Sequence, residues 1–230
     1  MPVSRNLISG NHMEGILLSG SNPGAGIVGN WIGATASGLD GGNGWSGIRI
    51  AGSLKAGNAT LAPAAVTTIT DNLLQYNGGD GVQVDSPAGR GHKILDNLFG
   101  WNAELGIDLG FDDGVTPNDG PDDPDGLQNY PLLTSVSFPT SDTLRVTGTL
   151  NSETSSHFTI QLYAATQGDP SGYGEGMLPL HTFSLNTDSS GDASFDETFA
   201  YPYSLSAHTH FSAIAIAADW STSEFGPNWE

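Results

Sequence analysis

Short runs of alternating apolar and polar residues recur through the first 130 residues, and none has the spacing of an amphipathic helix. In the run Gly81-Val-Gln-Val, the alternation predicts a strand with Val82 and Val84 pointing inward and Gln83 pointing outward. Similar runs lie at residues 15–18, 47–50 and 106–109. A second set of short apolar stretches is marked by Val3, Ile27, Ile69 and Ile94. This part of the chain is therefore predicted to form many short strands.

The runs belong to one repeat, in which an Asn is followed by a second Asn five residues later, by a Gly four residues after that, and then by the apolar strand. Three copies keep this spacing and begin at Asn6, Asn72 and Asn97. A looser copy begins at Asn30 and reaches its strand at Gly47, after a Gly-rich insertion. A repeat of about 24 residues with short strands predicts a parallel β-helix of about four to five coils. Because Asn tolerates left-handed backbone angles, we expect it at the corners between strands.

Longer alternating strands replace the repeat from about residue 131. Five are marked, with a turn at 186–192 between two of them: residues 144–150, 158–163, 180–185, 192–199 and 211–217. Six or so strands in about 100 residues predict an antiparallel β-sandwich of immunoglobulin-like size. The chain is therefore expected to be all-β, with a β-helix at 1–130 and a β-sandwich at 131–230.

The first part of the chain, from about residue 3 to 133, resembles the right-handed parallel β-helix repeat proteins of bacteria, a pectate-lyase-like superfamily. The most specific passages are Leu105-Gly-Ile-Asp-Leu-Gly110, Asp113-Gly-Val-Thr-Pro-Asn-Asp119 and Leu127-Gln-Asn-Tyr-Pro131. The resemblance implies the β-helix, a bacterial protein that is secreted or attached to the cell surface, and the sandwich that often follows such helices. The superfamily contains lyases, hydrolases, epimerases and non-catalytic stalks, so no single activity is implied.

The charge balance is strongly acidic, with 25 Asp and Glu against 6 Lys and Arg and a net charge of −19. Such a field repels nucleic acid and anionic membranes and disfavours unaided binding of polyanions. The absence of Cys excludes disulfides and thiol chemistry. No apolar run is long enough to span a membrane, and the first residues do not form a signal peptide. We expect a polysaccharide or surface glycan as the partner.

The chain begins inside the repeat, because Asn6 already occupies a corner position. The end coils of a solenoid need a polar cap. We therefore expect either that this is the C-terminal part of a longer protein or that another chain covers the first coil, as in a homo-oligomer.

An acidic, Gly- and Pro-rich loop follows the last repeat strand. Oxygen ligands of this kind suit Ca²⁺, which takes six to eight of them, so we expect a structural calcium site here. The alternative is a solvated loop without metal. The candidate ligands are Asp108, Asp112, Asp113, Asn118, Asp119, Asp122, Asp123 and Asp125.

Two pairs of carboxylates are candidates for catalysis. Asp71 and Asp96 precede the first Asn of neighbouring copies, and coils stacked about 4.8 Å apart would bring them close together. Asp85 and Asp108 lie diagonally on neighbouring Gly-led strands. A carboxylate separation near 5 Å is typical of retaining glycosidases. The alternative for each pair is a structural one, as exposed turn residues or as part of a polar ladder.

Polar and aromatic side chains are candidates for binding a sugar chain. Arg49, Gln83 and Asp108 are predicted to stack in one outward column of the Gly-led strands. Tyr76 and Trp101 share one repeat position and should stack on each other, which could form a sugar platform or simply seal the coil. Trp31 and Trp45 are further aromatic candidates.

Two functions are compatible with these residues. The first is a polysaccharide hydrolase that uses paired carboxylates, which is favoured over a lyase because the coils lack a cluster of basic residues. The second is a non-catalytic carbohydrate-binding or adhesin module of a larger surface protein.

Overall fold

The computed structural model describes residues 5–19, 24–51, 66–85, 90–110, 114–122, 124–203 and 208–230. Within these ranges the chain is all-β, with strands β1 to β17 and no helix. It divides into two compact units. The coil unit comprises Met1–Thr116 with Asp219–Ser221, and the antiparallel unit comprises Pro117–Ala218 with Thr222–Glu230. The described part of the chain therefore holds no helix that could cross a membrane.

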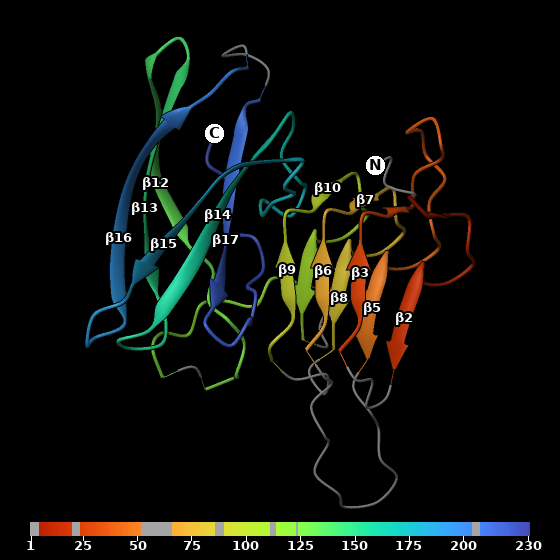
Figure 1. Cartoon of the computed structure of the whole chain (residues 1–230), viewed down its shortest axis with the longest axis horizontal. Helices are drawn as coiled ribbons and strands as arrows, with labels where there is room; N and C mark the ends of the chain where they lie inside the picture. Colours follow the sequence, from red (N-terminus) through yellow and green to blue (C-terminus); the bar gives the residue numbers. More distant parts are fainter. Residues whose placement is uncertain are drawn as a thin grey trace, which may run out of the picture. The chain divides into compact units, whose positions relative to one another are not determined.

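The coil unit consists of three stacked parallel sheets (Figure 1). Sheet 1 has the order β1-β4-β7-β10, sheet 2 the order β11-β8-β5-β2, and sheet 3 the order β3-β6-β9. Each successive coil adds one strand to each sheet. The strands are β1 (Leu7–Ile8), β2 (Ile16–Ser19), β3 (Gly26–Val28), β4 (Trp31–Ile32), β5 (Ile48–Ala51), β6 (Thr68–Thr70), β7 (Leu73–Gln75), β8 (Val82–Val84), β9 (Lys93–Leu95), β10 (Leu98–Gly100) and β11 (Ile107–Leu109).

The register of sheet 2 confirms the predicted repeat. Ile16 pairs with Ile48, Ile48 with Val82, and Val82 with Ile107, so one apolar column runs through all four coils. In the second to fourth coils these side chains are at most 1% exposed, whereas Ile16 in the first coil is half-buried. The apolar core is therefore closed within the stack and more open at its first coil.

At six of the eight corners the residue before the corner Asn, and not the Asn itself, adopts the left-handed backbone conformation. The prediction for Asn was wrong in this respect. Positive φ angles occur at Gly10, Gly29, Asp71, Tyr76, Asp96 and Trp101, each directly before an Asn. Because the Asn side chain bonds the Asn residues of the coils above and below, the residue before it makes the turn.

Two ladders of Asn side chains join the coils at their corners. In the first ladder Nδ2 of Asn6 donates to Oδ1 of Asn30, Asn30 to Asn72, and Asn72 to Asn97, at 2.8–3.1 Å. In the second ladder Asn11 donates to Asn43, Asn43 to Asn77, and Asn77 to Asn102, at 2.8–2.9 Å. The amide donates in the same direction at every step. Such ladders supply hydrogen bonds at the buried corners, where strands of two to four residues no longer pair.

The insertion of the second coil is a closed loop that returns the chain to the corner. Ala34 and Asp40 form an antiparallel bridge, and Gly41 N donates to Gly33 O at 3.0 Å. The loop therefore places Asn43 in the second ladder. Sequence spacing did not identify Asn43 as the second corner Asn of this copy, because the loop separates it from Asn30.

The antiparallel unit contains two three-stranded sheets (Figure 1). One has the order β12-β13-β16 and the other β15-β14-β17. Their inward side chains form one apolar core that includes Leu144, Phe158, Ile160 and Ala213, each 0% exposed. The strands are β12 (Leu132–Thr140), β13 (Thr143–Asn151), β14 (His157–Ala165), β15 (Leu178–Asn186), β16 (Asp192–Ala200) and β17 (His210–Ala217).

The segment before β12 belongs to the antiparallel unit, which begins at Pro117. Asn118 ties this segment together, because its Oδ1 accepts from Tyr130 N and its Nδ2 donates to Tyr130 O, both at 2.9 Å. Asn129 Nδ2 donates to Gly120 O and to Asn151 O at 3.0 Å. These bonds tie the segment before β12 to itself and to the end of β13.

Candidate functional site

The aromatic corner, defined as Tyr76 and Trp101, lies between sheets 1 and 2 of the coil unit. Strands β7 and β10 pair in register, so the residues that follow them lie side by side. The two rings stack with centroids 5.2 Å apart and an interplanar angle of 5°. The predicted stack is therefore confirmed. The Asn that follows each ring fixes its position, because Asn77 Nδ2 donates to Asn102 Oδ1 at 2.8 Å.

Both rings are carried by left-handed backbone, with φ of 60° at Tyr76 and 57° at Trp101. This conformation is a clear outlier for a bulky residue and costs of order 1–3 kcal/mol. The first coil uses Gly10, with φ of 69°, at the same position, so a glycine suffices for the turn. The aromatic side chains are therefore not required by the backbone of the corner.

The aromatic corner is open to solvent. Trp101 is 43% exposed, and Tyr76 is half-buried. Beside Tyr76 the second coil offers only Gly42, where an added Cβ would lie 2.0 Å from Tyr76 O. The Asp40 carboxylate accepts from Gly42 N at 3.0 Å, so a carboxylate lies next to the backbone of the corner. The corner thus combines a flat aromatic surface with an acidic neighbour.

The other aromatic candidates lie elsewhere on the coil unit. Trp31 belongs to sheet 1, and the guanidinium carbon of Arg5 lies 5.5 Å from the centroid of its ring. Arg5 and Trp31, with Asn6, Leu7 and Ala36, line a hollow of about 200 Å³. Trp45 is 49% exposed and follows Asn43, and its N–H donates to Met13 O at 3.2 Å.

Arg49 makes the main ion pairs of sheet 2. It lies beside Gln83, and Gln83 beside Asp108, as the predicted column requires. Its guanidinium bonds both oxygens of Asp85, at 3.1 and 3.0 Å, and one oxygen of Glu14 at 3.3 Å. The hydrogen bonds that Arg49 donates to Asp85 are the main reason that the pKa of Arg49 is raised. Arg49 therefore neutralises carboxylates from the coils on either side of its own.

These contacts bear on the candidate pair of Asp85 and Asp108. Both oxygens of Asp85 are occupied by Arg49, and its side chain is 9% exposed. Asp108 is 0% exposed in β11. A sugar chain at the surface would not reach either carboxylate in this arrangement.

Asp80 is a titratable residue that the sequence did not single out. It lies directly before Gly81, is 5% exposed, and accepts from Leu105 N at 3.0 Å and from Ser46 Oγ at 3.3 Å. Burial raises the pKa of Asp80 to about 6. Its position before a corner Gly, shared with Glu14 and Ser46, gave no indication that the side chain would be buried.

Asp71 and Asp96 form an exposed pair at the corner between sheets 3 and 1. Both have left-handed backbone, with φ of 58° and 57°. The preceding residues Thr70 and Leu95 are paired in register, so the two carboxylates belong to neighbouring coils as predicted. This geometry fits a structural role in the turn. It also leaves both carboxylates accessible to a substrate.

The calcium ligands proposed for the acidic loop are divided between the two units. Asp112, Asp113 and Asp123 lie outside the described residues, and Asp108 is buried in the coil unit. In the antiparallel unit, Asn118 bonds Tyr130, Asp122 is exposed, and Asp125 Oδ1 accepts from Leu127 N. Asp119 Oδ2 accepts from Asp125 N, while its buried Oδ1 has no hydrogen bond within the described ranges. Across those ranges no three acidic or His side chains come together, so the calcium site stays a prediction.

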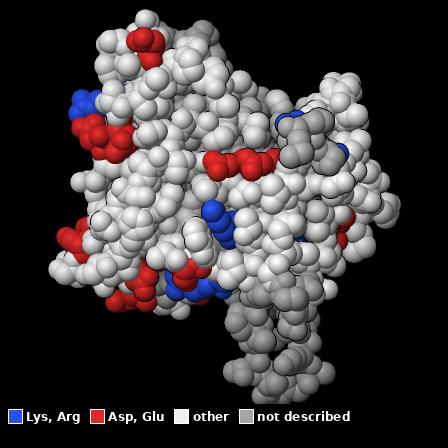
Figure 2. All heavy atoms as spheres, in the orientation of Figure 1, with Lys and Arg blue, Asp and Glu red and all other residues white. Residues whose placement is uncertain are grey.

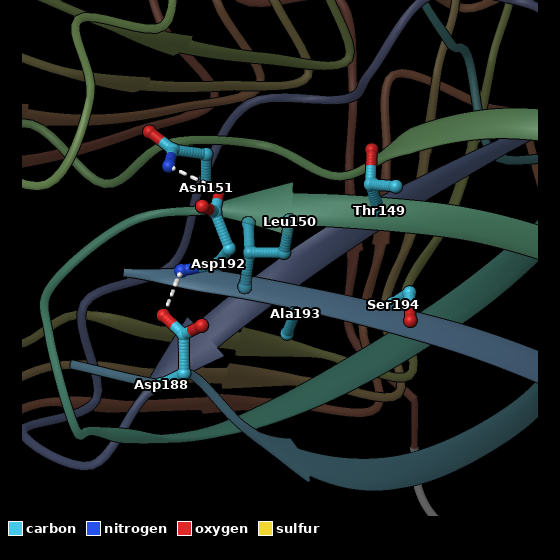
Figure 3. Close-up of a pocket in the computed structure, with 7 residues that line it drawn as sticks. All are labelled: Thr149, Leu150, Asn151, Asp188, Asp192, Ala193 and Ser194. Carbon is cyan, nitrogen blue, oxygen red and sulfur yellow. Dashed lines mark hydrogen bonds between the residues drawn. The ribbon is translucent and has the colours of Figure 1, made fainter. Parts of the chain in front are cut away.

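A hollow of about 440 Å³ lies on the antiparallel unit at the ends of β13 and β16 (Figure 3). Asn151 Nδ2 donates to Asp192 Oδ1 at 2.7 Å, and Asp188 Oδ1 accepts from Asp192 N at 3.0 Å. The backbone hydrogen bonds from Asp192 and Ser190 lower the pKa of Asp188. The polar groups of this hollow are thus used to hold the 186–192 turn. Its lining consists of Thr149, Leu150, Asn151, Asp188, Asp192, Ala193 and Ser194.

No protein-family model matches the chain, and no curated protein matches it. Among solved structures, a similarity is found to the chitinase ChiW from Paenibacillus sp. str. FPU-7, described as a bacterial cell-surface-expressed multi-modular enzyme machinery. The match covers 97% of this chain and 24% of that chain, with 9% sequence identity and a TM-score of 0.21. The chain spans about a quarter of the length of that chitinase, and a TM-score this low carries no argument about fold or function.

Proposed function

We propose that this chain is a non-catalytic carbohydrate-binding module of a bacterial protein that is secreted or displayed at the cell surface. In this proposal the coil unit is a right-handed parallel β-helix of the pectate-lyase-like kind and the antiparallel unit is an immunoglobulin-like sandwich. The aromatic corner is the binding site. A flat, partly wet pair of aromatic rings suits stacking against the apolar face of a sugar.

The observation that carries the proposal is the left-handed backbone beneath Tyr76 and Trp101. A bulky residue kept on left-handed backbone, where a glycine could make the same turn, is typical of functional positions. Here a glycine makes the same turn in the first coil, so the large rings are retained at a conformational cost. A binding role accounts for that cost, because it needs the rings and the exposure of Trp101.

The test is binding to an array of polysaccharides with the whole chain and two variants. Trp101→Gly removes the ring and supplies a residue suited to positive φ, so the coil should remain folded. We expect it to bind at least about tenfold more weakly, which corresponds to about 1.4 kcal/mol. Trp220→Gly is the control, because Trp220 is also exposed and left-handed but lies in the turn after β17. Equal binding by Trp101→Gly and the unaltered chain would contradict the proposal.

A polysaccharide hydrolase is the second candidate, supported by the exposed pair Asp71 and Asp96. These carboxylates and the aromatic corner lie at opposite ends of strands β7 and β10, about 16 Å apart for five residues of extended chain. A sugar chain bound along sheet 1 would pass both. Reducing-sugar release that disappears in Asp71→Asn and in Asp96→Asn would establish this candidate in place of the first. Binding without product in the unaltered chain would exclude it.

A further inference from the structure

The cationic side chains of the described chain are all engaged by its own residues. In the coil unit, Arg49 pairs with Glu14 and Asp85, Arg90 lies 3.8 Å from Asp219, and Arg5 and Lys93 lie over Trp rings. In the antiparallel unit Arg145 bonds Asp196. Lys55, the remaining basic residue, lies outside the described residues. Figure 2 shows a few separate basic groups on one face of the molecule. The sequence has 25 acidic residues against 6 Lys and Arg, so carboxylates outnumber these cations about fourfold.

Two exposed or half-buried Trp rings already bind a cation. The Arg5 guanidinium lies 5.5 Å from the ring centroid of Trp31, and Lys93 Nζ lies 4.6 Å from that of Trp220. A cation over an aromatic face is attracted by the ring quadrupole, and the gain is about 0.5–2 kcal/mol. Among the described residues, the rings of Tyr76 and Trp101 have no such cation. Within the described ranges, the aromatic corner is a stacked pair with no Lys or Arg over its outer faces.

Two exposed carboxylates belong to the turns that adjoin the aromatic corner, one on the second coil and one on the fourth. On the second coil, Asp40 is exposed and bonds Gly42 N, and Gly42 packs against the backbone of Tyr76. On the fourth coil, Glu104 is exposed and follows Trp101 by three residues, with its N–H bonded to Gly79 O at 3.3 Å. A cation that reaches the rings would therefore gain from both the aromatic surface and the neighbouring negative charge.

We propose that the aromatic corner selects a positively charged glycan, namely an amino-sugar polymer with free ammonium groups, over neutral and anionic glycans. This inference rests on the proposed function of the same site. The apolar face of one sugar ring stacks on Trp101 or Tyr76, and the ammonium group of that or the next residue lies beside Asp40 or Glu104. The net charge of −19 steers the polymer toward the protein and repels polyuronates.

The experiment compares three soluble oligosaccharides of equal length by calorimetry at mildly acid pH. These are a glucosamine oligomer, its N-acetylated counterpart and a galacturonate oligomer. We expect the glucosamine oligomer to bind about three- to tenfold more tightly than the acetylated one, and this preference should shrink as salt is added. Asp40→Asn and Glu104→Gln should each weaken binding of the glucosamine oligomer and leave the acetylated one unchanged. Glu153→Gln, an exposed carboxylate of the antiparallel unit, is the matched control.

The outcomes separate this inference from the proposed function. Equal binding of the amino and acetylated oligomers, with loss of both in Trp101→Gly, would overturn the cationic preference and keep the carbohydrate site. Two other results would each show unspecific charge attraction and overturn the inference. One is that the glucosamine oligomer binds Trp101→Gly as tightly as the unaltered chain, and the other is that polylysine displaces it equally well from both proteins. Failure of every glycan to bind would overturn both.

Discussion

The coil unit and the antiparallel unit bury their polar and apolar groups in different ways. The coil unit is built from strands of two to four residues, and its corners are joined by buried Asn ladders in which Asn72 and Asn97 are 0% exposed. The antiparallel unit has strands of eight or nine residues around a continuous apolar core. Repeated corner Asn residues thus hold the coil unit together, whereas long strand pairings and side-chain packing hold the antiparallel unit together.

This difference also bears on where binding can arise. In a stack of coils, one position per coil forms a column, so changing a corner residue from Gly to an aromatic alters the surface without altering the fold. The aromatic corner arises in this way, with Gly10 in the first coil and Trp101 in the fourth. In the antiparallel unit, by contrast, positive-φ residues such as Ser155 and Gly191 lie in the turns between strands.

The largest effect is expected from truncating the apolar core of the antiparallel unit. Phe158→Ala removes a ring that is 0% exposed and should lower the free energy of unfolding by about 3–5 kcal/mol. Hydrogen–deuterium exchange should show faster exchange in β13, β14 and β17 and unchanged protection in the coil unit. Phe158→Leu, with a smaller loss, is the control. Equal acceleration of exchange in both units would show that the two units lose their protection together.

Removing a buried polar side chain from the coil unit should lower the free energy of unfolding by nearly as much. Asn72 donates to Ile27 O, Thr70 O and Asn97 Oδ1, and accepts from Asn30, all at 2.8–3.1 Å. Asn72→Ala leaves several of these buried groups unpaired, at about 1–3 kcal/mol each, so we expect a loss of about 3–4 kcal/mol. Asn6→Ala, at the exposed end of the same ladder, should cost less than about 1 kcal/mol. Similar losses in the two variants, measured by urea denaturation, would contradict the role given to the ladder.

The buried carboxyl of Asp80 gives the coil unit a pH dependence. Its folded pKa of about 6 lies above the ordinary value, so it binds a proton more tightly in the folded state. Its contribution to stability is therefore full below about pH 4 and is lost as the pH rises through about 6. Asp80→Asn should stabilise the coil unit by about 2–3 kcal/mol at pH 8 and by almost nothing at pH 4. A difference of the same size at both pH values in chemical denaturation would argue against this assignment.

An effect no larger than that of Asp80→Asn is expected from calcium on the antiparallel unit. The buried Oδ1 of Asp119, which accepts no hydrogen bond within the described ranges, is the oxygen best suited to hold the ion there. Saturating Ca²⁺ should add up to about 2–3 kcal/mol to the free energy of unfolding of that unit, and Asp119→Asn should remove the gain. Glu153→Gln is the control. A melting temperature unmoved by Ca²⁺ and by chelator would exclude a structural calcium ion.

The repeat could be predicted from sequence because one side chain per coil fills each position. That regularity sufficed for the apolar column through Val82, for the order of the coils, and for the stack of Tyr76 on Trp101. It was insufficient at Asn43, because the inserted loop breaks the spacing that identifies a corner. The left-handed corner was assigned to the wrong neighbour, since the tolerance of Asn for positive φ does not decide which of two adjacent residues turns.

The chemistry of individual side chains was less accessible from sequence. The partners of Arg49 come from the coils on either side, and a long side chain can reach along or across strands, so a column of aligned residues does not determine its contacts. The burial of Asp80 depends on its neighbours in three dimensions, and so does the shift in its pKa. The candidate carboxylates therefore fell into different environments, with Asp85 paired, Asp108 buried, and Asp71 with Asp96 exposed.

The constant direction of the Asn ladders gives the coil unit two chemically different ends. Asn6 and Asn11 give their amide hydrogens to the second coil, so each leaves its carbonyl oxygen as an acceptor on the first coil. A parallel coil added there could donate to both oxygens and continue the ladders. Two copies that met through their first coils would instead oppose oxygen to oxygen at both corners, which is repulsive. The side-chain amides thus give the stack a direction, and only a coil in the same parallel orientation can continue the ladders at this end.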